Sequence, residues 1–454
     1  MTRDSRRTAG AALTACALLT AIAPIAAAVR PPKLQYEIST LPNGLTVVLE
    51  EDHSTPIVHL NLTYHVGSKN EKRGRTGFAH LFEHLMFKGS RNVEPEGHTS
   101  MIASIGGQSN AFTTEDETTF WETAPSQYLP MMLWLEGDRM ATLRINQETF
   151  TNERDVVKEE RRLRVDNQPY GRLNEIIYEQ VFTTHPYKHQ PIGSMEDLDA
   201  ASVDDVLDFY RTFYVPENAT LTLVGDIDPT QALQLAAQYL GRVPKAAKPV
   251  PRDIPKEPPQ TAERRVTLQT PWPLPAVVVA YHITYDGNPD SYPLHIVGKV
   301  LSDGQSSRIQ QKLVYEQQLA VAAFGGPNLI EDPNLFYAVA IVQPGRTPEQ
   351  AINGLIGEFD LLKTQPISER ELQRAKNQFA RDYILGRESD QEKARVLSHA
   401  VVIHHDIKTA DGEFDIFQGL TPADVQRVAR TYFTTNNRTV LTLLPSVRSE
   451  SDTK

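Results

Sequence analysis

Two histidines and a glutamate lie close together in the sequence, at His80, Glu83 and His84. In a helix, side chains four residues apart lie on the same face, so both imidazoles can reach a single cation. Glu83 lies beside them on that surface, where its carboxylate can take a proton from a water molecule. Zinc suits such a site, because it accepts imidazole nitrogen and carboxylate oxygen and leaves one position for water. The motif therefore predicts a zinc-dependent hydrolase with His80 and His84 as ligands and Glu83 as the base.

The motif is short, and a surface turn with an ordinary glutamate–histidine contact has the same pattern. Its neighbours favour the metal site. Residues 77–79 and 85–87 on either side are mostly apolar, so we expect the motif in a buried helix. Buried imidazole and carboxylate groups are costly unless they have a partner, and a metal ion would serve as that partner. A further carboxylate ligand has to come from elsewhere in the chain.

Residues 77–90, GFAHLFEHLMFKGS, resemble the active-site helix of the pitrilysin family of zinc peptidases, whose motif is the inverted His-x-x-Glu-His. Pitrilysin, insulin-degrading enzyme and the mitochondrial processing peptidase belong to this family. Further matches are residues 67–71 (GSKNE), 107–111 (GQSNA), 185–187 (HPY) and 192–193 (IG). The chain length is similar to that of the short, processing-peptidase-like bacterial branch. The resemblance implies a zinc endopeptidase that cleaves unfolded peptides or small protein fragments.

The resemblance also implies the residues that complete the metal site. The family's third ligand is a glutamate on another helix, and Glu160 stands at the matching position, so one Zn²⁺ per chain is expected on His80, His84 and Glu160. A supporting glutamate seven residues earlier corresponds to Glu153, and two helical turns place both carboxylates on one face. Glu159 is the competing ligand, but it lies about 100° around the helix from that face.

Residues 107–111 resemble the strand with which the family holds the backbone of its peptide substrate. Asn110 and Ala111 are the candidate substrate-binding residues of that strand. An extended strand of small or polar residues with a free edge can pair with a peptide backbone. An ordinary edge strand has the same pattern and is the alternative.

The resemblance breaks in the C-terminal half. There the family carries an arginine and a tyrosine, seven residues apart, that contact substrate near the metal and follow a Ser-Ser-Arg stretch, matched here by residues 306–308. Counting from that stretch gives Val314 and Val321, and neither side chain can donate a hydrogen bond. We therefore expect a homologous partner subunit that supplies the missing pair. A homodimer in which backbone groups or Tyr315 fill the gap is the alternative.

The elements that must position these residues form two similar halves. Segments 205–221 and 424–440 share the same order of residues at a constant offset, and residues 244–259 between the halves contain six prolines, as an extended linker does. We predict an α+β fold of two homologous domains, each a β-sheet packed with helices and joined by a Pro-rich linker. The expected parts are a zinc-bearing peptidase domain (29–243), the linker (244–262) and a C-terminal domain without the metal motif (263–446).

Local patterns predict the elements near the site. Strands are expected at 58–64, within 106–121 and at 276–281, and helices at 77–87, 129–143 and 148–182. Residues 58–64 alternate between apolar and polar types, which is typical of a half-buried strand with His59 and His65 on its polar side. Residues 404–406 (His-His-Asp) could bind a metal, but the sequence favours a surface turn there.

The N-terminus favours export. Basic residues followed by an apolar run that ends at Ala28 predict a signal peptide (1–28) and a periplasmic protein, with a membrane or lipid anchor as the alternatives. Cys16 is the only cysteine, so the mature chain would have no disulfide and no thiol nucleophile. A net charge of -11 without a basic stripe argues against nucleic-acid binding. Residues 447–454 are expected to be a disordered tail.

Two other functions fit part of this pattern. One is a non-catalytic scaffold subunit of a larger assembly, and the other is a periplasmic peptide-binding protein with a structural metal. Glu83 argues against both, because a scaffold has no need of the base and structural zinc sites usually have four protein ligands with no spare carboxylate.

Overall fold

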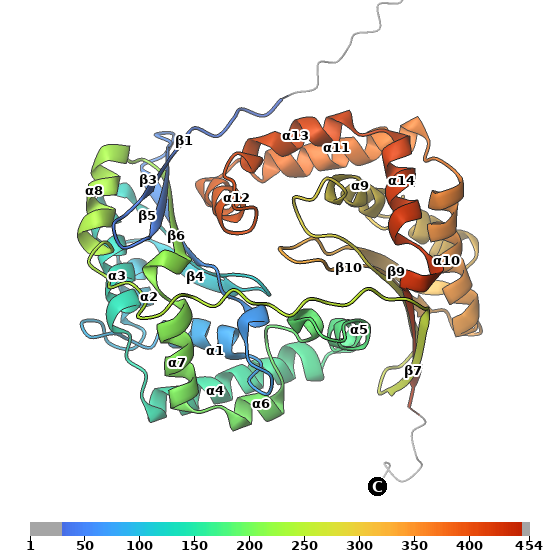
Figure 1. The fold of residues 1–454 in the computed structure, drawn as a ribbon, viewed down its shortest axis with the longest axis horizontal. Coiled ribbons are helices and arrows are strands. Elements are labelled where there is room, and N and C mark those ends of the chain that lie inside the picture. The colour runs from blue at the N-terminus through green and yellow to red at the C-terminus, as the bar shows by residue number, and fades with distance from the viewer. Residues whose placement is uncertain (1–29, 447–454) are drawn as a thin grey trace, which may run out of the picture. The chain divides into compact units, whose positions relative to one another are not determined.

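The computed structural model describes residues 30–446, so the expected signal peptide and C-terminal tail lie outside the described residues. Residues 34–446 belong to one compact unit, which contains two β-sheets covered by helices (Figure 1). This arrangement confirms the predicted α+β class with two similar domains.

The first sheet has the strand order β1-β2-β6-β3-β5-β4. Its strands are β1 (Tyr36–Thr40), β2 (Thr46–Glu51), β3 (Ile57–Tyr64), β4 (Gln108–Thr113), β5 (Thr118–Pro125) and β6 (Ala219–Gly225). The helices of this half are α1 (Phe78–Leu85), α2 (Gly97–Ser104), α3 (Leu129–Thr142), α4 (Gln147–Arg161), α5 (Leu173–Val181), α6 (Met195–Ala200), α7 (Val203–Phe213) and α8 (Pro229–Tyr239).

The second sheet has the order β7-β11-β8-β10-β9. Its strands are β7 (Arg264–Thr270), β8 (Ala276–His282), β9 (Ala320–Pro327), β10 (Leu335–Val342) and β11 (Arg438–Pro445). The helices are α9 (Ser291–Leu301), α10 (Pro348–Thr364), α11 (Glu369–Leu385), α12 (Asp390–Val402), α13 (Thr409–Gly419) and α14 (Pro422–Tyr432). Between α8 and β7 the chain forms no helix or strand, and this extended segment runs from one sheet to the other (Figure 1).

The two sheets repeat the same topology. β2 and β6 are parallel, as are β7 and β11, and the remaining pairs of the shared order are antiparallel in both sheets. The helix before the inner parallel strand ends in the same way in both halves. Asn218 Nδ2 donates to the Phe213 carbonyl (2.8 Å), and Asn437 Nδ2 donates to the Tyr432 carbonyl (2.8 Å). The repeat that the sequence indicates at 205–221 and 424–440 is therefore a repeat of structure.

Each sheet is covered on one face by a helix from the other half of the chain. Helix α12 packs against β3 and β6 of the first sheet, where it lies in Figure 1. The apolar cluster beneath it contains Leu34, Val48, Val224, Ala394, Leu397, Ala400 and Ala410. Helix α5 packs in the same way on the second sheet, in a cluster that includes Ile177, Tyr178, Val278 and Val339. Each half has a core of its own, and two further apolar clusters combine residues of both halves.

The contact of α12 with the first sheet corrects the expectation that β3 is a half-buried strand. The alternation in β3 is real, because Val58, Leu60 and Leu62 face the apolar core of the first half. The opposite side is polar but not exposed: His59 is fully buried and bonds Asn61 (2.8 Å between His59 Nε2 and Asn61 Oδ1). The prediction of a half-buried strand was wrong, because α12, far along the sequence, covers the polar side.

The predicted helix over 148–182 is also divided. α4 ends at Arg161 and continues as a π-helix over Arg162–Asp166, and α5 begins only at Leu173. Tyr170 between them has a φ of 61°, a left-handed conformation that a continuous helix does not allow. The break lets α4 stay in the first half while α5 reaches the second sheet.

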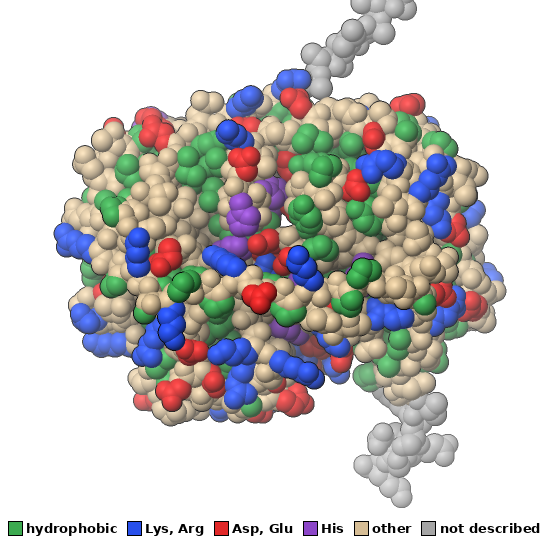
Figure 2. Space-filling model, in the orientation of Figure 1, with side chains coloured by type: hydrophobic (Ala, Val, Ile, Leu, Met, Phe, Trp, Pro, Cys, Tyr) green, Lys and Arg blue, Asp and Glu red, His purple; other side chains and the backbone are tan. Residues whose placement is uncertain are grey.

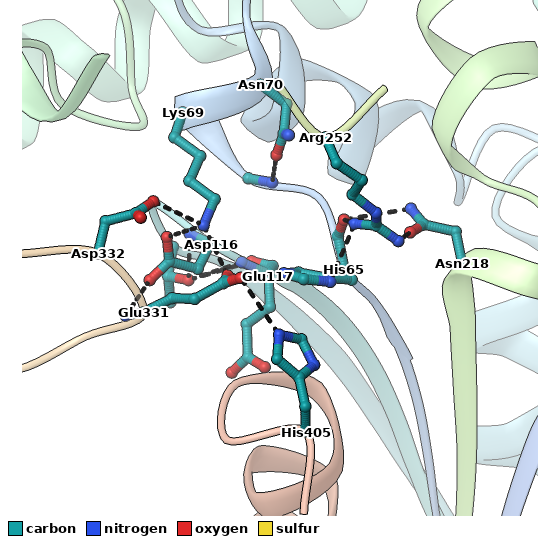
Figure 3. A network of polar contacts seen from close by, with 12 residues as sticks. His65, Lys69, Asn70, Asp116, Glu117, Asn218, Arg252, Glu331, Asp332 and His405 are labelled. Atoms are coloured by element: carbon teal, nitrogen blue, oxygen red, sulfur yellow. Dashed lines mark hydrogen bonds and ion pairs between the residues drawn. The ribbon is translucent and has the colours of Figure 1, made fainter. Parts of the chain in front are cut away.

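A polar network also joins the two halves (Figure 3). The Lys69 ammonium, only 4% exposed, lies 3.0 Å from Asp116 Oδ1, 2.6 Å from Glu331 Oε2 and 3.2 Å from Asp332 Oδ2. His65 Nε2 lies 2.6 Å from the same Glu331 oxygen. His65 is therefore held at this contact and does not lie on an open face of the early strand.

Figure 2 shows the molecule in the orientation of Figure 1. Charged and histidine side chains gather near the middle of the visible face, where the extended segment crosses. Burying Lys69 costs free energy that its three carboxylate partners offset. The network therefore fixes how the β4–β5 turn, which carries Asp116, meets the second half.

Candidate metal centre

Helix α1 presents the His-x-x-Glu-His motif on one side. Phe78, Leu81, Phe82 and Leu85 of this helix are buried in the core of the first half. Because these apolar residues face inward, the polar residues of the motif share the remaining face, and all three are half-buried.

The start of α1 is fixed by a glycine and a buried carboxylate. Gly77 has a φ of 91°, and a Cβ atom there would lie 3.0 Å from the Ile192 carbonyl oxygen, so only glycine fits without strain. The Glu71 carboxylate accepts hydrogen bonds from the N–H groups of Gly77 (2.9 Å) and Ala79 (2.8 Å). It thereby satisfies two donors of the first turn, and His189 Nε2 contacts the same carboxylate (2.9 Å).

Helix α4 brings a carboxylate to both histidines. Glu160 Oε2 lies 3.7 Å from His80 Nε2 and 3.4 Å from His84 Nε2. The ligand atoms of these three residues all lie within 4.8 Å of one another. Glu153, two turns earlier in α4, lies 3.5 Å from His84 Nδ1 through its Oε2. His84 is therefore held from its Nδ1 side, and its Nε2 faces Glu160.

The two neighbouring glutamates of α4 have different surroundings. The side chain of Glu159 is 57% exposed and pairs with Arg162 (2.9 Å). The side chain of Glu160 is only 16% exposed, and its second oxygen pairs with Arg164 (2.7 Å). The structure thus brings Glu160, not Glu159, to the histidines.

Glu83 is held beside the cluster by a residue from the edge strand. The Thr113 hydroxyl, at the end of β4, donates a hydrogen bond of 2.6 Å to Glu83 Oε2. Burial raises the pKa of Glu83, and the charge of Glu160 adds to this, while Thr113 and His84 act in the opposite direction. A carboxylate with a raised pKa beside a group of possible metal ligands is suited to accept and return a proton.

The histidines differ in their electrostatic surroundings. Burial, reinforced by the charge of His84, lowers the pKa of His80 to about 4. Burial also acts to lower the pKa of His84, but the contacts with Glu153 and Glu160 outweigh it and raise this pKa to about 9. A positive charge is therefore favoured between His84 and the two glutamates.

Strand β4 lies at the edge of the first sheet and carries the two candidate substrate residues. Asn110 pairs in register with Trp121 of β5 and Ala111 with Phe120, while no strand within the described residues pairs with the other side of β4. The Asn110 side chain is exposed. Since the same strand ends in Thr113, an edge open to a peptide runs next to Glu83.

The two positions expected to lack substrate contacts lie in the second half. Val314 is in a π-helix over Gln310–Glu316 and packs partly buried against the second core. Val321 is in β9 and is 45% exposed. Tyr315, the alternative donor, is 51% exposed.

Three residues of the centre were missed in the sequence. Lys88 Nζ lies 3.0 Å from Glu153 Oε1, and Arg164 pairs with Glu160. Arg164 stands four residues beyond Glu160, a spacing that could have indicated it, whereas Lys88 meets Glu153 only through the contact of α1 with α4. Thr113 has no such signal, because only the fold of β4 brings it to Glu83.

The expectation for residues 404–406 was partly wrong. A turn does follow α12, but the side chain of His404 is only 6% exposed and faces Asp286. His405 is the exposed residue of the pair, with 62% of its side chain accessible. His404 belongs to a cluster with Asp286, which lies far from it in the sequence, so no short motif contains both residues.

A cavity of about 830 Å³ lies near the start of α1, where Thr76 is part of its lining. Its lining includes Glu71, Arg161 and His189 but none of His80, Glu83 or His84. The candidate centre is therefore separate from this cavity, although Glu71 touches both the cavity and the first turn of α1.

Two parts of the chain match domain models of one peptidase family. "Insulinase (Peptidase family M16)" matches residues 46–193, and "Peptidase M16 inactive domain" matches residues 200–379. The zinc protease PqqE of Helicobacter pylori is 30% identical over 414 residues, which are 90% of this chain and 93% of that protein. The mitochondrial-processing peptidase subunit beta of Saccharomyces cerevisiae is 26% identical over 356 residues, 75% of this chain and 76% of the relative.

A solved structure has the same fold. The crystal structure of a protease from Helicobacter pylori superposes with a TM-score of 0.87 at 30% identity, covering 91% of this chain and all of that one (100%). Two repeated α+β domains with an inverted His-x-x-Glu-His helix in the first define a class of zinc peptidases. The chain belongs to peptidase family M16, the insulinase family, as the resemblance of residues 77–90 predicts.

Proposed function

We propose that this protein is a zinc-dependent endopeptidase that hydrolyses unfolded peptides or small protein fragments. The observation that carries the proposal is the convergence of His80, His84 and Glu160, with Glu83 held beside them by Thr113. Relatives named zinc proteases support the same reading.

The donor set fits zinc. Two imidazole nitrogens and one carboxylate oxygen are a ligand set of catalytic zinc sites, which keep a fourth position open. The contact of Glu153 with His84 Nδ1 leaves Nε2 free to bind, as supporting carboxylates do in such sites.

Zinc bound there would act as a Lewis acid and lower the pKa of a water molecule to about 7. The residues of the chain would do the rest. Glu83 would take a proton from the attacking water and then deliver it to the leaving amine. Thr113 would keep the Glu83 carboxylate aimed at the water, and Arg164 and Lys88 would hold the two glutamates of α4 in place.

Strand β4 would hold the substrate. Its open edge can add a peptide as a further strand, with Asn110 and Ala111 meeting the peptide backbone. Main-chain pairing of this kind favours extended substrates, which supports unfolded peptides over folded proteins.

A homologous subunit would complete the site. Val314 and Val321 offer no hydrogen-bond donors from their side chains. The yeast relative is named a subunit, which supports the view that this chain works in a pair. A homodimer that uses Tyr315 is the alternative arrangement.

We further propose that the chain is exported to the periplasm, with domains 29–243 and 263–446 on either side of the linker 244–262. The signal peptide (1–28) supports export by its sequence pattern. One structurally similar protein is named a periplasmic protease, PqqL of Escherichia coli. Within residues 30–446, no helix combines the length and apolar character needed to cross a membrane.

The test is cleavage of a fluorogenic peptide by the purified chain, alone and with a homologous subunit that carries the arginine–tyrosine pair. We expect zinc-dependent cleavage that a chelator abolishes and added Zn²⁺ restores, with a rise in turnover when the partner is present. A chain that never cleaves, with or without the partner, would instead be a scaffold subunit. Full activity alone, unimproved by a partner, would contradict the paired arrangement.

A further inference from the structure

A second group of possible metal ligands lies where the two halves meet. Asp286 follows β8, His399 lies in α12, and His404 lies in the turn after that helix. Asp286 Oδ2 is 3.1 Å from His399 Nε2 and 3.1 Å from His404 Nε2. One ligand atom from each of the three residues lies within 4.8 Å of the others.

The spacing of these atoms is that of a metal site. A tetrahedral ion about 2.0 Å from each ligand atom separates those atoms by about 3.3 Å. The corresponding contacts of the first cluster, from Glu160 to its two histidines, are 3.7 and 3.4 Å. The second cluster therefore needs no larger rearrangement than the first to bind an ion.

Hydrogen bonds indicate which nitrogen of His404 is free to bind. The Asp406 carbonyl can only accept, so the Thr409 hydroxyl donates its hydrogen to it (2.8 Å). The Thr409 oxygen then accepts from His404 Nδ1–H (2.8 Å). In neutral His404, Nε2 therefore presents a lone pair to the Asp286 carboxylate, and two acceptors at 3.1 Å need a proton or a cation between them.

Glu117 offers a fourth donor atom, the second carboxylate oxygen of the set. Glu117 Oε2 is buried and has no hydrogen-bond partner among the residues that the structure describes. Its side chain points away from the Lys69 network toward the turn that carries His405 (Figure 3). Glu117 is not one of the three residues whose ligand atoms lie within 4.8 Å of one another, but its charge acts on His399, so its side chain would have to turn toward the cluster to bind the same ion. A buried carboxylate oxygen without a partner is costly, and a bound cation would satisfy it.

We propose that Asp286, His399 and His404 form a second divalent-cation site, of the zinc class, with Glu117 as the fourth donor. Two imidazoles and two carboxylates give a closed, four-ligand set, which is typical of a structural site. This site does not depend on the proposed peptidase activity.

The site would tie the substrate strand to the second half. Glu117 belongs to the turn between β4 and β5, whereas the other three ligands belong to the C-terminal half. Asp116 in the same turn is already held by Lys69 and by the Tyr187 hydroxyl (2.6 Å). A cation on Glu117 would clamp the turn from its other side and so set the position of β4.

The experiment uses the full chain with His80→Gln and His84→Gln, which removes the first cluster. Calorimetric titration with Zn²⁺ should then find one bound equivalent per chain. Adding His404→Gln should weaken this binding at least about 100-fold, and Glu117→Gln should weaken it about 10- to 100-fold. His405→Gln, a change at the exposed neighbour, should leave the binding unaltered and serves as the matched control.

Zn²⁺ should also raise the Tm of the parent chain and of the His405→Gln variant, but not of the Glu117→Gln variant at low Zn²⁺. This second measurement covers the case in which the His404→Gln chain does not fold. The proposal is overturned if the parent chain, with His80→Gln and His84→Gln, binds no Zn²⁺. It is also overturned if neither His404→Gln nor Glu117→Gln weakens binding.

Discussion

Replacement of Thr113 by valine tests how the base is held. Valine keeps the shape of the side chain and removes only the hydroxyl, which donates the 2.6 Å hydrogen bond to Glu83. A hydrogen bond to a charged group contributes about 1.5–3 kcal/mol. Since about 1.36 kcal/mol corresponds to a tenfold change in rate, loss of the bond should lower kcat by about 10- to 150-fold.

The assay is steady-state cleavage of a fluorogenic peptide in the assembly that shows Glu83-dependent activity. We expect KM and zinc content to stay near their wild-type values, because Thr113 contacts neither the ligands nor, in this account, the bound peptide. Thr113→Ser keeps the hydroxyl and should restore most of kcat. If Thr113→Val leaves kcat within about twofold, or if serine is as harmful as valine, the positioning role is refuted.

Three further predictions concern metal retention and stability. Glu160→Gln should strip zinc from the first cluster, whereas the exposed Glu159→Gln should not, as measured by metal analysis after dialysis. Lys69→Met leaves buried carboxylates without their cation and should lower the free energy of unfolding in urea by about 3–5 kcal/mol; an unchanged midpoint would contradict this. Burial lowers the pKa of His59 to about 4, so the unfolded chain takes up a proton that the folded chain does not as pH falls from about 6.5. Stability should therefore fall by about 3 kcal/mol between about pH 6.5 and 4, and His59→Gln should remove that part of the pH dependence.

Short-range patterns predicted the parts of the centre that lie on one helix. His80, Glu83 and His84 can be placed from spacing alone, because a helix fixes which residues share a face. Glu160 required the family resemblance, since many glutamates on a charged helix have equally plausible spacing. In the structure Glu160 is the less exposed of the two neighbours and Glu159 the more exposed, and the ligand role of Glu160 stays a prediction.

Other features depend on contacts between distant segments. His59 looked like a residue on a solvated face, because the sequence near β3 contains no sign of the α12 helix that covers it. Thr113 reaches Glu83 only through the pairing of β4 with β5. His404 meets Asp286 across more than a hundred residues, so the local pattern of residues 404–406 favoured a surface turn and did not indicate this contact.

In the proposed mechanism Glu83 is the base and not a ligand of the metal. The most direct measurement compares Glu83→Gln with the wild type for zinc content and for cleavage of the same peptide. We predict unchanged zinc at the His80, His84 and Glu160 cluster and a loss of turnover of about 10²- to 10⁴-fold. Loss of zinc in this variant would make Glu83 a ligand, and unimpaired cleavage would mean that another group activates the water.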